Sequence, residues 1–113
     1  MTCGDILLVN YPFTNASGSK LRPVLVVSVD AYNTGDDLIF VPISSAPNLA
    51  DQYVYAIRDT EAFFEKTGLK HSSFVKWTKP LTISRRVVHR KLGKLPGAQV
   101  SEIQEKIKGL FGG

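Results

Sequence analysis

Apolar side chains along most of this chain stand in short continuous runs or alternate with polar ones, and both patterns are typical of β-strands. Strands are expected at residues 5–9, 24–29, 38–43, 53–57 and 73–77, with one or two more within 83–92. The valine-rich run at 24–29 is expected to be a buried strand. Because proline has no N–H to give to a sheet, Pro23 is expected at the entrance of that strand.

Helical spacing is clear in the C-terminal segment, where apolar residues recur at every third or fourth position: Val100, Ile103, Ile107, Leu110 and Phe111. Pro96 or Ser101 marks the start of this amphipathic helix, and the two terminal glycines end it. A short helical turn is expected at 61–66, with Thr60 as its cap and Gly68 as its stop.

Short polar stretches predict the turns and loops between these elements, at 15–19, 33–36, 44–51 and 95–97. A sheet of so few strands avoids open edges by curling on itself, with the helix covering one side. The expected fold is therefore mainly β: an SH3-like β-barrel with small helices and a C-terminal amphipathic helix. The length of 113 residues fits a single domain that spans 1–113.

Basic side chains are concentrated in the second half of the chain. The net charge is +4, but residues 1–64 hold three basic and seven acidic side chains, whereas residues 65–113 hold eleven and three. No acidic residue occurs between Lys66 and Lys94. A positive zone of this kind favours a polyanion, commonly through its phosphates. A solvated basic face, or a surface that docks an acidic protein, fits the charge equally well.

The number of cysteines and the length of the apolar runs indicate the cellular compartment of the protein. Cys3 is the single cysteine, which leaves no internal disulfide and fits a reducing compartment. No apolar run approaches the ~20 residues that span a bilayer, and no signal peptide is apparent. A cytoplasmic protein without a membrane partner is therefore expected. Motifs for phosphate-binding loops, zinc sites and nucleophile elbows are absent, so neither a metal nor another cofactor is expected.

Chemistry without a metal relies on Arg, Lys, His and hydroxyl groups, and RNA is a substrate that suits them. The RNA 2′-OH attacks the neighbouring phosphate, while the protein supplies a base, an acid and cations for the extra charge on phosphorus. Arg22, between a Gly/Ser loop and an apolar strand, can hold a phosphate bidentately. Ser44 and Ser45 follow the strand at 38–43 and can bond a phosphate or a base edge. The simpler alternative for Arg22 is an ion pair on the surface. For the serines it is hydrogen bonding within a turn.

Several segments, taken in order, resemble the PemK/MazF (Kid) family of toxins. They are GDILLV at 4–9, YPFT at 11–14, KLRPVLVVS at 20–28, VPISS at 41–45, GLKHSS at 68–73 and RKLGKL at 90–95. Each segment alone is a weak signal, but the ordered set is specific and covers nearly the whole chain.

The resemblance implies the toxin of a type II toxin–antitoxin system. Such a toxin is a metal-independent, sequence-specific endoribonuclease that cuts single-stranded RNA and leaves 2′,3′-cyclic phosphate and 5′-OH ends. The resemblance also implies a homodimer and neutralisation by a cognate antitoxin, through an extended C-terminal segment of that partner. DNA would be contacted only indirectly, through the antitoxin.

The resemblance also assigns roles to residues. Arg22 corresponds to the catalytic arginine before proline, and Ser44 to the Thr or Ser that acts with it at the scissile phosphate. Two regions differ from the family. The loop at 15–20 lacks the Glu that many members carry, and segment 70–73 offers His71 but no carboxylate where some members place an acid and a base. His71 or an unidentified group is therefore the expected base, and an exposed polar role suits His71 equally well.

Basic and aromatic residues outside the motifs are candidates for holding the RNA strand. Lys76 and Lys79 are expected to track its backbone, and Trp77 to stack against a base, although a place in the core or a dimer interface suits Trp77 equally well. His89 is either phosphate-facing or solvated. The residues expected to bind RNA are Lys20, Ser45, Lys76, Trp77 and Lys79.

Two further functions stay open. A catalytically weak or inactive barrel of the same family would bind nucleic acid or an acidic protein without cutting. A structural or dimerising barrel would have no nucleic-acid role. Product analysis separates cutting from binding, and behaviour insensitive to salt would favour the structural role.

Overall fold

Three stretches of the chain, 1–11, 20–45 and 52–112, are described by the computed structural model of this protein. The loop expected at 15–19 and most of the loop expected at 44–51 lie outside the described residues. The elements follow in the order β1 (Asp5–Tyr11), β2 (Lys20–Val26), α1 (Asp30–Asn33), β3 (Asp37–Ser44), β4 (Tyr55–Ile57), α2 (Phe64–Thr67), β5 (Ser73–Val75), β6 (Leu81–Ser84), the 3₁₀ helix η1 (Arg85–Val87), β7 (Val88–Lys94) and α3 (Gly97–Leu110).

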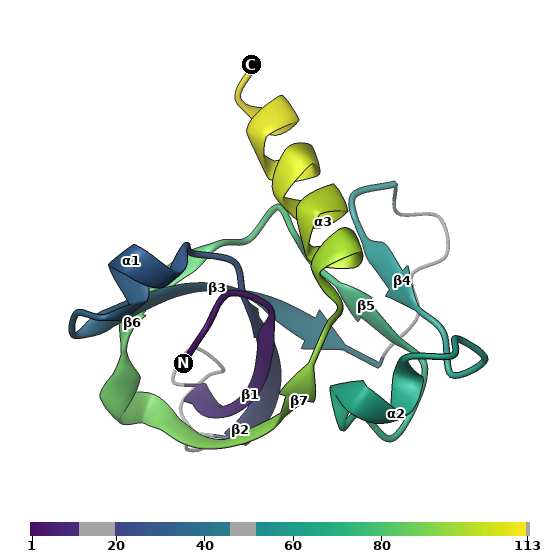
Figure 1. Cartoon of the computed structure of the whole chain (residues 1–113), viewed down its shortest axis with the longest axis horizontal. Coiled ribbons are helices and arrows are strands. Elements are labelled where there is room, and N and C mark those ends of the chain that lie inside the picture. The colour runs from purple at the N-terminus through teal and green to yellow at the C-terminus, as the bar shows by residue number, and fades with distance from the viewer. Residues whose placement is uncertain (12–19, 46–51, 113) are drawn as a thin grey trace.

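The strands form one antiparallel sheet in the order β4-β5-β3-β2-β1-β7, with β6 paired to β3 as well. β2 lies along one edge of β3, while β6 and β5 follow one another along its other edge. Because η1 leads from β6 into β7, and β7 pairs with β1, the sheet curls into a barrel (Figure 1). The prediction of a mainly β barrel with a C-terminal helix is confirmed, and its SH3-like type stays a prediction.

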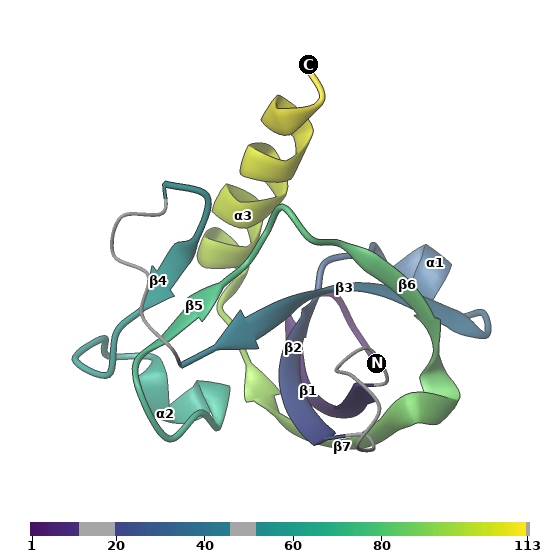
Figure 2. The same cartoon turned by 180° about the vertical axis from the view of Figure 1, so that it is seen from behind.

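The middle parts of β1, β2 and β3 are buried on both faces. Figure 2 shows why: the curled sheet encloses one face, and α3, β4 and β5 gather on the other side of the molecule. Successive side chains of a strand leave opposite faces, so the part of a strand in this position is mostly apolar. The cluster inside the barrel holds Leu7, Val9, Val24, Val26, Leu38 and Phe40. The outer cluster joins Ile6, Leu25, Val41 and Ile43 to Ile57, Val75, Trp77, Leu95, Val100 and Ile103.

β2 begins earlier than the sequence suggests, so Pro23 lies inside the strand rather than at its entrance. Pro23 pairs with Leu8 of β1, whereas the register between β2 and β3 starts only at Val24. The nitrogen of Pro23 can therefore face a side of β2 that has no partner strand in the described residues, which is where a sheet tolerates proline. The strand also ends at Val26, before the predicted boundary.

Both predicted helices form, with bounds that differ from the expected ones. Pro96 rather than Ser101 marks the start of α3, as its N-cap. α2 starts later than expected: its N-cap is Phe63, which makes no side-chain capping bond, so Thr60 is not the cap. Gly68 ends α2 in the left-handed conformation, with φ of 72°, as predicted. None of the helices in the described stretches is long and apolar enough to cross a membrane.

α1 is a helix that the sequence pattern missed, because four residues are too few to show a helical period. Polar contacts of the buried Asn33 hold it. Ser28 Oγ donates to Asn33 Oδ1, and Asn33 Nδ2 donates to the Ser28 carbonyl at 2.9 Å. The Arg85 guanidinium donates to the carbonyl of Asn33. α1 is therefore fixed by the segment after β2 and by η1, which is distant in the sequence.

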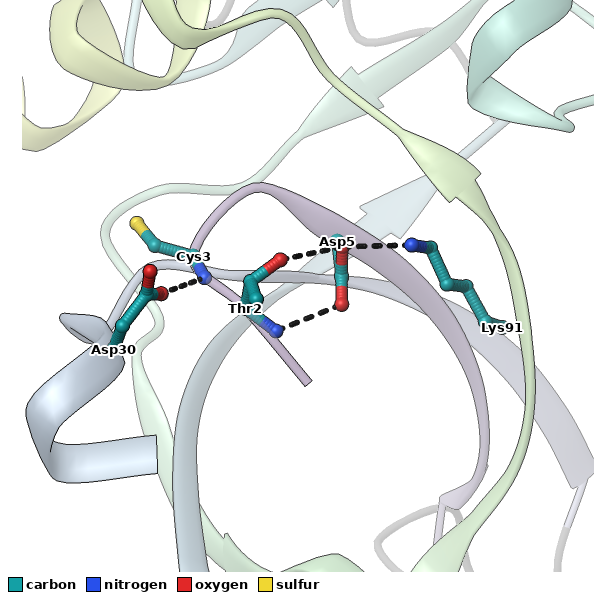
Figure 3. Close-up of polar contacts among 5 residues, drawn as sticks. All are labelled: Thr2, Cys3, Asp5, Asp30 and Lys91. Carbon is teal, nitrogen blue, oxygen red and sulfur yellow. Dashed lines mark hydrogen bonds and ion pairs between the residues drawn. The ribbon is translucent and has the colours of Figure 1, made fainter. Parts of the chain in front are cut away.

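A buried carboxylate joins the N-terminal residues and β7 to β1 (Figure 3). Asp5 is 2% exposed and accepts hydrogen bonds from the N–H of Thr2 at 2.8 Å and from its hydroxyl at 3.0 Å. Lys91 Nζ lies 3.2 Å from Asp5 Oδ1. Burial alone raises the pKa of Asp5, but the Thr2 hydrogen bonds and the Lys91 ammonium outweigh burial, so the pKa is below its ordinary value.

Asp5→Asn is expected to lower the free energy of unfolding at neutral pH by about 2 kcal/mol, because Lys91 and Thr2 lose a charged acceptor. Since the folded-state pKa is lowered, the contribution of Asp5 is complete above roughly pH 4 and is lost as the pH falls through the folded-state value. Urea unfolding at pH 7 and pH 3 measures both effects, and the variant should lose less stability on acidification than the parent.

The control is Glu105→Gln, which removes the carboxylate of an exposed ion pair. Glu105 Oε1 lies 3.2 Å from Lys108 Nζ, and the two side chains are 72% and 71% exposed. This variant is expected to change stability by less than ~0.5 kcal/mol. Equal losses in the two variants would contradict the anchoring role of Asp5.

Candidate functional site

A pocket of about 480 Å³ opens between the barrel and the segment that follows α2. Residues of β1, β2 and β7 form one wall, the end of β3 forms another, and the segment from Gly68 to Ser73 faces them. The volume is in the range of pockets that bind small organic ligands. Four residues that the sequence marks for chemistry line this pocket together: Arg22, Ser44, Ser45 and His71.

Arg22 reaches the pocket from β2, next to Pro23. Its side chain is half-buried, and its Nε is enclosed without a hydrogen-bond acceptor among the described residues. It forms no ion pair with a carboxylate in that part of the chain. The simpler alternative, a surface arginine paired with a local carboxylate, therefore finds no support in the described residues, and an enclosed donor of this kind suits an anionic ligand.

The two serines lie where β3 ends. Ser44 is the last residue of β3, pairs with Phe74 of β5 and is half-buried, whereas Ser45 follows it and is exposed. β3 pairs with β2 as far as Pro42 and with β5 at Ile43 and Ser44, so the position of Ser44 is set by the sheet rather than by a loop. A hydroxyl at the end of a fixed strand can orient a ligand in the pocket.

Two glycines bring the opposite wall close to the barrel. A β-carbon on Gly93 would lie 2.2 Å from the carbonyl oxygen of Lys66, and one on Gly68 would lie 2.1 Å from the carbonyl oxygen of Leu92. The backbones of α2 and β7 therefore touch at these positions, which only glycine allows. Gly68 also supplies the left-handed turn that sends the chain over the pocket.

The segment after Gly68 carries Lys70 and His71 into the lining. Ser73 Oγ donates to the carbonyl of His71 at 2.8 Å, and Ser72 Oγ accepts from the N–H of Asp59 at 2.8 Å. These bonds fix the backbone on which His71 stands, and the imidazole itself is exposed. An exposed imidazole at the edge of a pocket can exchange protons with a bound ligand.

Arg90 and Lys70 line the pocket but were not assigned a role from the sequence. Arg90 is exposed and belongs to β7, where it pairs with Leu8 of β1. The signal that pointed to Arg90 was its place in the segment at 90–95, which the resemblance includes. The sequence could not single it out, because nine basic residues occur between Lys66 and Lys94.

The pocket combines positive charge with an apolar wall. Arg22, Lys70 and Arg90 are basic, and no carboxylate lines the pocket in the described stretches. Leucines and other aliphatic side chains complete the lining, including Leu8 and Leu69. A site of this kind suits a ligand that has both phosphate and an apolar or aromatic part.

Some residues expected to bind RNA lie outside this pocket. Lys20 and Lys79 are exposed, and Lys76 is half-buried, but none of them is part of the lining. Contact of these residues with RNA stays a prediction. His89 is also exposed and outside the lining, which favours its solvated alternative.

Trp77 lies in the core. Its side chain is 6% exposed, it belongs to the outer apolar cluster, and its ring packs against Tyr53 with 5.7 Å between the ring centroids. A ring in this position cannot offer a face to a base. The structure therefore corrects the expectation of base stacking and favours the core alternative for Trp77.

The described residues favour neither metal binding nor thiol chemistry. No three side chains of His, Cys, Asp or Glu come together there in a way that could hold a metal ion. Burial, followed by the nearby Asp30 carboxylate, raises the pKa of the Cys3 thiol. A thiol with a raised pKa is mainly neutral at pH 7 and a weak nucleophile.

Comparison with known proteins gives a family and a shared fold. The family model described as "PemK-like, MazF-like toxin of type II toxin-antitoxin system" matches residues 2–111. No curated protein matches the chain.

Solved structures of mycobacterial and Deinococcus radiodurans proteins share this fold. Toxin MazF-mt6 of Mycobacterium tuberculosis matches with a TM-score of 0.72 at 19% identity, over 95% of both chains. An endoribonuclease from a mycobacterial species, in complex with its cognate antitoxin, has a TM-score of 0.76 at 16% identity, over 99% of this chain and 95% of that one. A MazE–MazF structure from Deinococcus radiodurans has a TM-score of 0.75 at 19% identity, over 99% of this chain and 95% of that one.

Gly93→Ala is expected to lower the free energy of unfolding by about 2 kcal/mol, because the added methyl meets the backbone of Lys66 and forces α2 away from β7. Gly109→Ala in α3 is the matched control, since a β-carbon there meets nothing within 4 Å. The control should be neutral or stabilising by up to ~1 kcal/mol. Thermal unfolding measures both, and equal stability of the two variants would contradict the close approach.

Proposed function

We propose that this chain, which belongs to the PemK-like, MazF-like toxin family of type II toxin–antitoxin systems, is an endoribonuclease that cuts single-stranded RNA in the Arg22 pocket. The observation that carries the proposal is the place of Arg22 in the pocket lining, where it has no carboxylate partner among the described residues. A phosphate of RNA supplies such a partner. The fold shared with a mycobacterial endoribonuclease supports the same activity.

The reaction uses groups that the pocket and the RNA contain. The 2′-oxygen forms a bond to phosphorus, and the bond from phosphorus to the 5′-oxygen breaks. The products are a 2′,3′-cyclic phosphate and a 5′-OH. His71 accepts the proton of the 2′-OH, and Arg22 is the candidate that supplies a proton to the departing 5′-oxygen.

Arg22 and the serines act on the phosphate itself. The guanidinium of Arg22, whose Nε is enclosed, offsets the extra negative charge of the phosphorane-like state. Ser44 and Ser45 orient the phosphate from the end of β3. The aliphatic wall of the pocket receives the less polar parts of the nucleotide.

The proposed partners are single-stranded RNA and a cognate antitoxin. The mycobacterial endoribonuclease is described with its cognate antitoxin, and the Deinococcus radiodurans MazF with MazE. The excess of positive charge in residues 65–113 suits an acidic segment of such a partner. A homodimer, a cytoplasmic site of action and cleavage at particular RNA sequences complete the proposal.

A binding module without cleavage is the second candidate, and one observation favours it. No carboxylate lines the pocket in the described residues, so proton transfer depends on His71. If the parent protein retains RNA but forms no cyclic-phosphate ends on long incubation, the chain binds without cutting.

Arg22→Ala is expected to slow RNA cleavage by about 10²- to 10³-fold, because the transition state loses its enclosed cation. Arg22→Lys keeps the charge but not the planar fork, and should restore only a small part of the rate. Cleavage of a single-stranded RNA, with analysis of the product ends, measures the effect, and expression in cells reports growth inhibition.

The control for Arg22 is Arg58→Ala, which removes an exposed arginine outside the pocket and should leave cleavage unchanged. Circular dichroism checks that both variants fold. Parent-like yields of cyclic phosphate from Arg22→Ala would contradict the proposed role of Arg22.

His71→Ala is expected to slow cleavage by about 10²-fold, because the 2′-OH loses its base. Added imidazole should restore part of the rate, since the exposed position leaves room for it. His89→Ala, an exposed histidine outside the pocket, is the matched control and should cleave normally. A parent-like rate for His71→Ala would assign the base to another group.

A further inference from the structure

We propose that Arg90 holds the phosphate next to the scissile one, so that the pocket takes two successive phosphates of an RNA strand. The inference rests on the proposed ribonuclease function and names a substrate-positioning residue for it. Four observations support it: the sheet register, the direction of Arg90, the charge of the pocket and the difference in exposure between the two arginines.

The register places Arg22 and Arg90 on opposite sides of β1. Leu8 pairs with Pro23 of β2 and with Arg90 of β7, whereas Arg22 pairs with Val9, the next residue of β1. Adjacent strands lie about 4.8 Å apart, which puts the backbones of Arg22 and Arg90 roughly 10 Å from one another. The two side chains start from opposite faces of the sheet, because Val9 belongs to the cluster inside the barrel and successive residues alternate, but both line the pocket at the strand ends. Arginine side chains that start this far apart can each bind one of two neighbouring phosphates.

Arg90 is available to a ligand because the residue next to it is engaged elsewhere. Lys91 Nζ lies 3.2 Å from the buried Asp5 carboxylate. Successive side chains leave opposite faces of a strand, so Arg90 leaves β7 on the other face, and it lines the pocket. No carboxylate in the described residues forms an ion pair with Arg90.

The charge of the pocket exceeds what one phosphate needs. A phosphodiester carries one negative charge, and its phosphorane-like state carries two. Arg22, Lys70 and Arg90 bring three positive charges to the bound RNA, and no carboxylate among the described residues lines the pocket to offset them. A second phosphate balances the remaining cation.

The two arginines differ in exposure. The Nε of Arg22 is enclosed, where a cation acts strongly on a charge that changes during the reaction. Arg90 is exposed, where water screens it and where it suits a phosphate whose charge stays constant. The enclosed arginine therefore belongs to the reacting phosphate and the exposed one to its neighbour.

The test uses an RNA oligonucleotide whose cut site has been mapped with the parent protein. A 2′-deoxy nucleotide at the cut site prevents cleavage, and a neutral methylphosphonate replaces either the linkage before the scissile phosphate or the linkage after it. One of these two replacements should weaken binding by the parent about tenfold, the value for one charge-assisted contact. Arg90→Ala should bind the unmodified oligonucleotide about tenfold more weakly and be insensitive to that same replacement.

Two further measurements separate this inference from alternatives. On cleavable RNA, Arg90→Ala should raise KM with little change in kcat, whereas Arg22→Ala lowers kcat. Arg86→Ala is the matched control, since Arg86 is an exposed arginine of η1 outside the pocket, and it should bind and cut normally. A fall in kcat for Arg90→Ala, or losses from the methylphosphonate and from Arg90→Ala that simply add, would overturn the inference.

Failure of the ribonuclease proposal would have a different signature. If the parent binds RNA without cutting it, the salt dependence of binding still reports the number of phosphates that the protein contacts. Loss of one contact should reduce the slope of log K against log salt by about 0.7 for a single strand. Arg90→Ala should show that reduction and Arg86→Ala should not, and an unchanged slope for Arg90→Ala would overturn the inference whether or not the RNA is cut.

Discussion

Burial of the middle parts of β1, β2 and β3 on both faces is the constraint on which the rest of this structure depends. A strand with two buried faces has no solvent side, so both of its faces must be covered by other parts of the chain. The barrel covers one face by curling the sheet through β6, η1 and β7. α3, β4 and β5 cover the other. The order of the strands, the position of the C-terminal helix and the place of α2 all follow from this double requirement.

The pocket forms where that covering stops. The strands β1, β2 and β3 run past the outer cluster, and the functional side chains come from these exposed ends and from the segment after α2. Polar groups at a strand end are fixed by the sheet but still reach solvent, which combines a precise position with access for a ligand. The contact of Gly68 and Gly93 with neighbouring backbone sets how far the opposite wall stands from the strands.

Electrostatics divides the basic side chains into two groups. Lys91 neutralises the buried Asp5 and anchors β7, so its charge is used inside the protein. Arg22, Lys70 and Arg90 have no described carboxylate beside them in the pocket lining, so their charge is directed to a ligand. The same strand, β7, therefore supplies a structural cation and a ligand-facing cation at successive positions.

The sequence by itself determined the class of fold, most of the strands and the C-terminal helix, because periodicity and short motifs are local properties. It also named Arg22, Ser44 and His71 as candidates, and the structure brings these three into the lining of one pocket. The sequence could not give α1, which depends on contacts of Asn33 with Arg85 far along the chain. It also left open whether Trp77 faces a ligand or the core, since an alternating strand has two faces and only packing decides which one is covered. Arg90 was one basic residue among nine until the register with Leu8 placed it across β1 from the Arg22 strand. Tertiary structure decided these points because each depends on which distant segments meet, and the pattern of a single segment does not contain that information.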